Sequence, residues 1–316
     1  MNEFDNIIAE AGKDAAEKST PKVQSIDISA GGEGKKSHGE MMAEKRNACY
    51  AMIDDACLDA MSSPENMNRF LAVQSRFERY SLNNNLLIYM QMPDAVRLKD
   101  FDAWKKDNMG VKKGAKSIMI LEPYTYTGAD QQQHRAFNAK NVFDITAVNA
   151  PPEVYPQPKS YEAKKLIAAL VHGSPVPVRK TEQQMSESAV YDVQNKVIYF
   201  KQGLSFNEIF PAIAKALAHA EMAKGVEHYR TEEHEFAARC SANVLSQKYG
   251  VEASSVSINS IPPKFADLES EELKKELSDI HGNVKEISKR MYESFEKSNE
   301  KEQQKPSKEN KNREER

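Results

Sequence analysis

The sequence predicts an α+β protein made of two folded segments and a C-terminal helix. Apolar residues recur at helical spacing in several long stretches, of which residues 41–61 are the first. Short apolar runs of strand length, at 117–121 and 142–148, stand between the helical stretches. Residues 189–200 contain two short apolar runs around a polar turn, which predicts a β-hairpin, and two more helical patterns follow.

The first elements are a polar arm and two helices. Residues 1–40 contain too few large apolar side chains to offset the entropy of ordering, so we expect a disordered arm. A helix is predicted over 41–61, and Ser63 with Pro64 forms the cap and first turn of a second helix. The asparagines at 83–85 favour a break, because their side chains compete for backbone hydrogen bonds.

The rest of the front segment is predicted to be short elements. A short helix is expected at 101–107. The run 117–121 is typical of a buried strand that ends at Glu122-Pro123, and 142–148 is the second strand candidate. The Gln-rich residues 128–134 between them predict an exposed loop or hairpin tip.

Four prolines between residues 150 and 158 predict a domain boundary. The front domain would then span 41–150, and a second small α+β domain would span 151–263. Besides the hairpin, the second domain is predicted to hold a helix at 161–172, a strand near 176–179, and helices at 207–224 and 231–249.

Residues 264–296 predict one amphipathic helix. Its apolar residues alternate at spacings of four and three, which is typical of a short coiled coil or of a helix docked on its own domain. These residues are Leu273, Leu277, Ile280, Val284, Ile287 and Met291. In the coiled-coil alternative, residues 268–295 would bind a second copy or another protein. Residues 297–316 are almost wholly charged and polar, and we expect them to be disordered.

Composition narrows the function classes. The net charge of −3 excludes a strongly basic coat over the whole chain, so any nucleic-acid surface must be local. Three cysteines without metal or disulfide spacing predict free thiols. No secretory signal pattern and no apolar run of about 20 residues is present. We therefore expect a cytoplasmic protein that does not contact the membrane and needs no cofactor.

Positive charge is concentrated in the front segment. Residues 69–126 carry ten basic and six acidic side chains, so their net charge is +4 against −3 for the chain. Seven aromatic residues, from Phe77 to Tyr126, are interleaved with these cations. Cations that follow phosphates and rings that stack on bases are the two requirements of single-strand binding. Aromatic side chains at helical spacing are, however, more often part of a core.

Three segments of the front domain resemble the N-terminal domain of ArdC antirestriction proteins. They read Tyr-Ser-Leu-Asn-Asn-Asn-Leu-Leu-Ile-Tyr-Met-Gln at 80–91, Phe-Asp-Ala-Trp at 101–104, and Gly-Val-Lys-Lys-Gly-Ala-Lys-Ser-Ile-Met-Ile-Leu-Glu-Pro at 110–123. Residues 142–146 are similar to the strand that closes that domain. The resemblance implies single-stranded-DNA binding by a protein of a mobile genetic element, in antirestriction or conjugative transfer.

The candidate DNA contacts are cations, rings and amides of this segment. They are Arg76, Arg79, Tyr80, Asn84, Gln91, Trp104, Lys112, Lys113 and Lys116. Amide groups can read base edges or hold backbone turns, and a ring such as Tyr80 can stack on a base or on the core. The lysines of the Lys-Lys-Gly-x-Lys turn favour phosphate contact, with a merely solvated turn as the alternative. Trp104 is a stacking candidate that would more often be core.

The second domain resembles a zincin-like zinc peptidase that has lost its motif. Such peptidases carry His-Glu-x-x-His on one helix, where both histidines bind zinc and the glutamate acts as general base. Here the helix reads His219-Ala220-Glu221-Met222-Ala223, so the glutamate and the second histidine are missing. Glu221 cannot replace them, because residues two apart on a helix point about 200° apart.

Two vestigial metal positions are left. The next helix resembles the segment that supplies the third zinc ligand in these peptidases, and Glu235 takes that position. His219 and Glu235 alone do not make a catalytic zinc site, which needs three protein ligands. We therefore predict no catalytic residue, no metal, and a pseudo-peptidase.

Two alternatives to a DNA-binding protein stay open at this stage. One is an active zinc metallopeptidase with non-standard ligands, and the other is a scaffold of a conjugation apparatus that works through residues 268–295. A measurement of zinc content tests the first alternative, and a measurement of self-association through the C-terminal helix tests the second.

Overall fold

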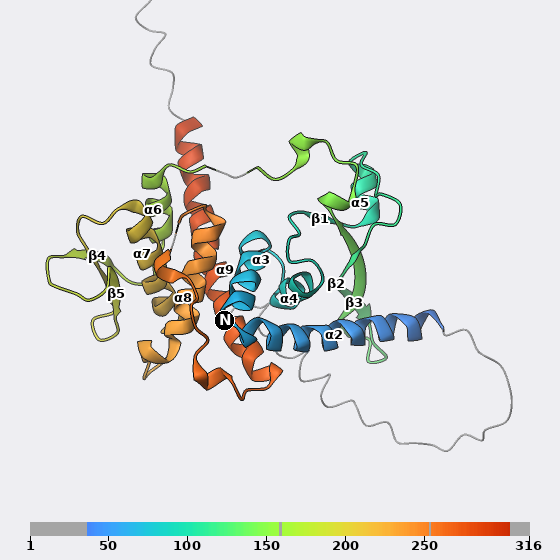
Figure 1. Ribbon diagram of the computed structural model, residues 1–316, viewed down its shortest axis with the longest axis horizontal. Helices are drawn as coiled ribbons and strands as arrows, with labels where there is room; N and C mark the ends of the chain where they lie inside the picture. Colours follow the sequence, from blue (N-terminus) through green and yellow to red (C-terminus); the bar gives the residue numbers. More distant parts are fainter. Residues whose placement is uncertain (1–36, 158–159, 253, 304–316) are drawn as a thin grey trace, which may run out of the picture.

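The computed structural model describes residues 37–157, 160–252 and 254–303, and it confirms a mixed α and β fold (Figure 1). No helix in the described part of the chain is both long and apolar enough for a membrane span. The elements are, in chain order, α2 (His38–Ser62), α3 (Pro64–Arg76), α4 (Leu82–Gln91), β1 (Leu98–Lys99), α5 (Phe101–Lys106), β2 (Ile118–Thr127), β3 (Gln133–Asp144), η1 (Ile145–Ala147), η2 (Pro152–Val154), α6 (Ala163–Val171), β4 (Val178–Thr181), β5 (Ala189–Asp192), β6 (Val197–Lys201), α7 (Phe206–Met222), α8 (Thr231–Lys248), η3 (Ser254–Val256), η4 (Pro263–Phe265) and α9 (Ser270–Gln303).

The first two helices begin at side-chain caps. Ser37 and Glu40 form a capping box at the start of α2, so residues 37–40, which the sequence assigned to the disordered arm, belong to the helix start. Residues 1–36 of that arm lie outside the described residues. The predicted cap of α3 is confirmed, because the Ser63 hydroxyl accepts from the backbone N–H of Asn66 at 3.1 Å. Pro64 is the first residue of the helix.

The break predicted at residues 83–85 is wrong. The chain turns earlier, over residues 77–81, and the three asparagines lie in the first turn of α4 behind the cap Ser81. Asparagine is tolerated there because Asn84 finds its hydrogen-bond partners outside the helix, on Leu121.

The front sheet has the strand order β1-β3-β2 and is antiparallel. β2 and β3 pair from Ile118↔Val142 to Thr127↔Gln133, and the exposed turn predicted between them is confirmed. The predicted end of the strand at Pro123 is wrong, since β2 continues to Thr127. β2 is an edge strand, which tolerates a residue without an N–H group.

The second sheet has the order β4-β6-β5, with β4 parallel and β5 antiparallel to β6. The hairpin predicted around residues 189–200 is confirmed as β5 and β6. The two helices predicted after it are confirmed as α7 and α8. They pack on each other, and α7 also packs on β5 and β6.

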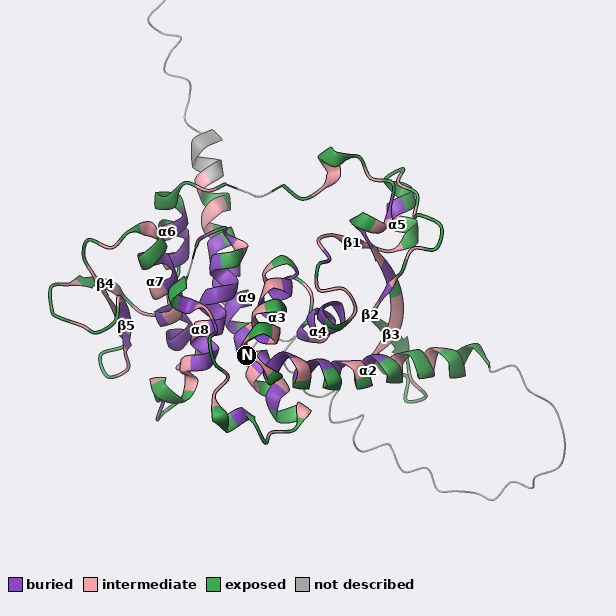
Figure 2. Ribbon diagram, viewed as in Figure 1, coloured by how far each residue is buried: buried purple, intermediate pink, exposed green. Residues whose placement is uncertain are grey.

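The C-terminal helix α9 is docked on its own chain. All six residues of its predicted seam are at most 2% exposed, and the helix packs on α2, α6, α7 and α8 (Figure 2). Of the two alternatives for this seam, the docked helix is therefore the one in the structure. α9 also continues to Gln303, so the disorder predicted from 297 is wrong as far as 303, and residues 304–316 lie outside the described residues.

One hydrophobic core runs through both halves of the chain. Buried side chains of α2, α3 and α4 are continuous with those of α6, α7, α8 and α9. The halves also share polar contacts, since the Asn68 side-chain amide in α3 donates to the Ile258 carbonyl at 2.8 Å. The proline-rich segment at 150–158 connects the halves through η2, and independent folding of the two predicted domains remains a prediction.

We predict that Ile280→Ala lowers the free energy of unfolding by about 2–5 kcal/mol, because it leaves a cavity where the halves meet. Urea denaturation measures this loss. The control Lys289→Ala, at an exposed position of the same helix, should change stability by less than about 0.5 kcal/mol. Unchanged stability of Ile280→Ala, together with loss of an oligomer in sedimentation, would show that the seam binds another copy instead.

Candidate functional site

Asn84 and Gln91 bind the outer edge of β2. The Asn84 amide donates to the Leu121 carbonyl at 2.9 Å and accepts from the Leu121 N–H at 2.8 Å. Gln91 makes the same two bonds with Met119, at 2.9 and 2.8 Å. Both amides thus complete the backbone pairing of an edge strand, and their predicted role at base edges is corrected to a structural one.

Three other predicted contacts are also held by the protein itself. Trp104 is fully buried and its indole N–H donates to the Phe143 carbonyl at 2.9 Å, so it cannot stack on a base. Arg76 donates to the carbonyls of Ala95, at 2.9 Å, and Pro93. Tyr80 lies half-buried, edge-on to Phe77, and packs against the core.

Arg79 does not join the predicted lysines. Its side chain is exposed beside Tyr292 of α9, close enough for its charge to lower the pKa of that tyrosine. The hydrogen bond from Tyr292 to Glu296 has the larger effect, so the net shift of the Tyr292 pKa is upward. The three lysines follow α5, and Figure 1 shows α5 and α9 well apart with α3 and α4 between them.

Five exposed lysines gather at the α5 end of the front domain. We call Lys105, Lys106, Lys112, Lys113 and Lys116 the lysine-rich end. Residues 105–116 contain these five cations and one acid, Asp107, so their net charge is 5 − 1 = +4. Asp107 is itself paired with Lys99. The positive charge of the front domain is thus concentrated on twelve consecutive residues.

A small separate core fixes the shape of this end. Trp104, Ile145 and Val148 pack together beneath it. The Lys112 N–H donates to the Ala147 carbonyl at 2.9 Å, and its ammonium donates to the Thr146 carbonyl at 3.0 Å. The loop that carries the lysines is therefore tied to η1, which presents them on an ordered surface.

Buried Asp144 supports the same region. One of its carboxylate oxygens accepts from the backbone N–H groups of Val96 and Arg97, at 2.8 and 2.9 Å. The other oxygen accepts from the Thr146 N–H at 3.1 Å and caps η1. Three backbone donors compensate a carboxylate that has no exposed surface.

A second polar centre lies between α7 and α8, around the buried side chain of His219. The His219 Nε2 atom lies 3.2 Å from Glu235 Oε2, and its Nδ1 atom lies 2.7 Å from the Tyr229 hydroxyl. A carboxylate can only accept, so Nε2 donates to Glu235 and, in the neutral ring, Nδ1 accepts from Tyr229. Both predicted vestigial positions therefore meet in space.

Two cations bind the same carboxylate. The Lys215 ammonium lies 3.0 Å from Glu235 Oε1 and 2.6 Å from Glu187, and Arg239 lies 3.3 Å from Glu235 Oε1. Burial alone would raise the pKa of Glu235, but the hydrogen bonds from His219 and Lys215 outweigh it and hold the pKa at about 2. Glu235 is therefore ionised and neutralised by protein cations.

The centre does not fit a zinc ion. Ala220 and Ala223 stand where the general base and the second histidine of the peptidase motif would be. Glu221 points to the opposite face of α7, as its spacing predicts, and pairs with Arg290 of α9 at 2.6 Å. No group of three His, Cys, Asp or Glu side chains in the described part of the chain could hold a metal ion.

The sequence reading missed Lys215. The signal was present, because Lys215 precedes His219 by one helical turn and shares its face of α7. Without the fold, however, nothing in the sequence placed Glu187 and Glu235 beside it. Lys105 and Lys106 contribute to the net charge of residues 69–126, but the sequence did not predict them as DNA contacts.

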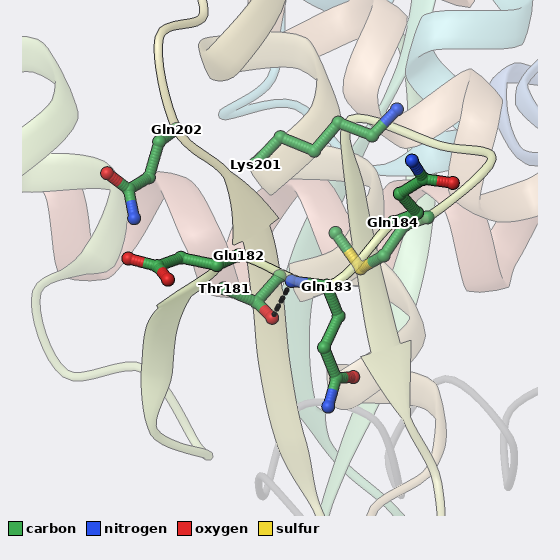
Figure 3. A pocket seen from close by; sticks show the side chains of 7 residues that line it. Thr181, Glu182, Gln183, Gln184, Lys201 and Gln202 are labelled. Carbon is green, nitrogen blue, oxygen red and sulfur yellow. Dashed lines mark hydrogen bonds between the residues drawn. The ribbon is translucent and has the colours of Figure 1, made fainter.

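An open polar hollow lies beside the loop from β4 to β5, with a volume of 530 Å³ (Figure 3). Its lining is amide-rich, with Gln183 and Gln184 in the loop and Gln202 after β6. Neither His219 nor a residue of the lysine-rich end lines it. The hollow is therefore separate from both centres.

Residues 56–153 match the family model described as the N-terminal domain of anti-restriction factor ArdC. This segment is an ArdC-like domain. The match lies almost wholly inside the predicted front domain and contains the lysine-rich end, while the His219 centre lies outside it. No protein among those with curated descriptions matches the chain.

Two solved structures of one protein are similar to the chain beyond the ArdC-like domain. They are the metal-free and the Mn(II)-bound crystal structures of the antirestriction ArdC protein from the R388 plasmid. Their sequence identity to this chain is 12% and 13%, and the TM-scores are 0.46 and 0.48. The alignments cover 70% and 68% of this chain and 86% and 84% of the R388 chain.

We predict that Lys215→Met destabilises the protein at pH 7 by about 1 kcal/mol, a modest value because 36% of the Glu235 side chain is exposed and its ion pairs are screened. Below pH 4.5 the unfolded state protonates while folded Glu235, with a pKa of about 2, does not, so stability falls as pH falls. The variant raises that folded pKa and flattens this acid slope.

Urea denaturation at several pH values measures both effects of Lys215→Met. The double variant Lys215→Met/Glu235→Gln serves as the matched control, because it removes the carboxylate that the first change leaves unpaired. An acid slope identical to that of the unchanged protein would contradict the role given to Lys215.

Proposed function

We propose that this chain binds single-stranded DNA and acts in antirestriction for a mobile genetic element, during or after transfer of that element. The observation that carries the proposal is the ArdC-like domain at residues 56–153. The family model is described as the N-terminal domain of the anti-restriction factor ArdC.

The lysine-rich end supports the proposal on physical grounds. A net charge of +4 on twelve residues attracts phosphates although the whole chain carries −3. The cations lie on a tied-down loop, so little conformational entropy is lost when they bind a backbone. Contacts from lysines to phosphates carry no sequence information, which agrees with binding that tolerates any sequence.

We also propose that the half of the chain around His219 is a peptidase-like module without catalytic activity. Its third-ligand carboxylate, Glu235, is neutralised by Lys215 and Arg239. A hydrolytic zinc site needs three protein ligands and a base beside the metal-bound water. Here a histidine and a carboxylate are the only remnants, and a lysine supplies the positive charge.

In the cell, we propose a cytoplasmic protein whose partner is single-stranded DNA. The docked position of α9 argues against a scaffold that self-associates through residues 268–295, because the seam is already covered. The exposed face of that helix is left for any protein partner.

We predict that changing Lys112, Lys113 and Lys116 together to alanine weakens binding of a labelled oligothymidine at least about tenfold at low salt. Removing three phosphate contacts should also reduce the slope of log K against log salt by about 2, at about 0.7 for each contact on a single strand. Fluorescence polarisation at several salt concentrations measures both quantities.

The matched control for that variant changes Lys180, Lys285 and Lys289, which are exposed and remote in sequence, to alanine. This control removes the same three positive charges, so a site confined to the lysine-rich end predicts near-normal binding. Equal losses of affinity in both variants would show that binding depends on net charge and not on this site. If the unchanged protein does not bind the strand at all, the proposed function is wrong.

We predict that the purified protein incubated with zinc and then dialysed holds far less than one equivalent of metal. Two protein donors are too few, and the cations beside Glu235 oppose a divalent ion. Elemental analysis measures the content. One equivalent of zinc that disappears in His219→Ala would instead support an active peptidase with unusual ligands.

A further inference from the structure

The β2–β3 hairpin extends beyond the core that supports its base. Ile118, Ile120 and Leu121 are buried, but every residue of β2 from 122 to 127 is exposed (Figure 2). The partner residues 133–138 of β3 are exposed or half-buried. The outer part of this hairpin is thus a two-stranded ribbon with solvent around it.

Three rings form a row on one face of the ribbon. Tyr124 and Tyr126 are two residues apart on β2 and therefore share a face, and His134 is the cross-strand partner of Tyr126. Ring centroids are 6.0 Å apart for the two tyrosines and 5.5 Å apart for Tyr126 and His134, which are stacked. We call these three residues the aromatic row.

The row is far more exposed than the other aromatic clusters of the protein. Tyr124 and Tyr126 are 38% and 48% exposed, and the residue opposite Tyr124 is the small Ala136. A cross-strand pair of rings stabilises a hairpin, but two rings are enough for that role. It also does not require the tyrosines to be exposed. Flat rings spaced along an exposed ribbon instead match the stacking surface that unpaired bases require.

Both acids of the ribbon are bound by neighbouring side chains. Glu122 is paired with Lys140 at 2.6 Å, and Asp130 accepts from the His134 ring at 2.9 Å. On the opposite face of the ribbon the Arg135 guanidinium lies 5.9 Å from the centre of the Phe137 ring. Glu122 is therefore bound to a cation, and Asp130 is hydrogen-bonded to a ring of the row itself.

We propose that Tyr124, Tyr126 and His134 form a stacking platform for unpaired bases of a single-stranded nucleic acid. This inference rests on the proposed function and adds the site where bases are held. The lysine-rich end ends two residues before β2 begins, so one strand connects the cationic surface to the platform. Phosphates and bases would then be held by different parts of the same ArdC-like domain.

The test compares Tyr124→Ala/Tyr126→Ala with Tyr124→Phe/Tyr126→Phe in the full-length protein. The alanine variant should bind labelled oligothymidine at least about tenfold more weakly, since each stacked base contributes a comparable factor. The phenylalanine variant keeps the rings and should bind like the unchanged protein. The salt slope should stay the same in both, because neither change removes a charge.

A second measurement separates stacking from phosphate contact, and its first comparison uses only the unchanged protein. The unchanged protein should bind an abasic oligonucleotide of equal length at least about tenfold more weakly than oligothymidine. The alanine variant should show little difference between the two, because the rings that discriminate them are gone. Circular dichroism and thermal unfolding confirm that the variant is folded.

Several outcomes would overturn the platform without touching the proposed function. One is normal binding by the alanine variant while the lysine variant is weak, and another is equal affinity of the unchanged protein for abasic and normal strands. Loss of a dimer in the alanine variant, seen by sedimentation with binding unchanged, would assign the row to a protein contact. No binding of any strand by the unchanged protein would instead remove the proposed function itself.

Discussion

The rest of the structure depends on the burial of one apolar stripe along α9. Six side chains of this helix are almost completely covered by α2, α6, α7 and α8, and each contributes about 1.5–3 kcal/mol when it leaves water. The stripe joins a front half, which carries the lysine-rich end, to a second half, which carries the His219 centre. Arg290 of the same helix also binds Glu221, so the back of α7 is fixed by the helix that closes the core.

Several polar side chains of the front half hydrogen-bond to backbone N–H and C=O groups, and these side chains are not available to bind a ligand. An edge strand that packs beside a helix needs partners for its outward N–H and C=O groups, and Asn84 and Gln91 supply them to β2. Trp104 and Asp144 do the same for the neighbouring chain segments. The lysines of the α5 end and the tyrosines of the β2–β3 ribbon are among the residues that face solvent.

Charge balance explains how the Glu235 carboxylate is accommodated between α7 and α8. A half-buried carboxylate such as Glu235 is costly unless a positive charge lies beside it. In a zinc peptidase the metal provides that charge. Here Lys215 and Arg239 provide it, and His219 with Tyr229 completes the hydrogen bonds. The arrangement keeps the packing of α7 on α8.

The sequence by itself determined most of the helices, the cap at Ser63 and Pro64, the second hairpin and the ArdC resemblance, because these depend on local periodicity, turn chemistry and the order of short motifs. It also determined that Glu221 could not share the face of His219, since helical geometry alone requires this. Only the tertiary structure decided that the α9 seam is covered within the chain, and that Asn84, Gln91 and Trp104 serve the fold. The length of the β2–β3 ribbon and the place of Lys215 beside Glu235 were decided there as well. The contacts of Lys215, Gln91, Asn84 and Trp104 join residues 20 to 39 positions apart. One-dimensional spacing does not encode which distant groups meet.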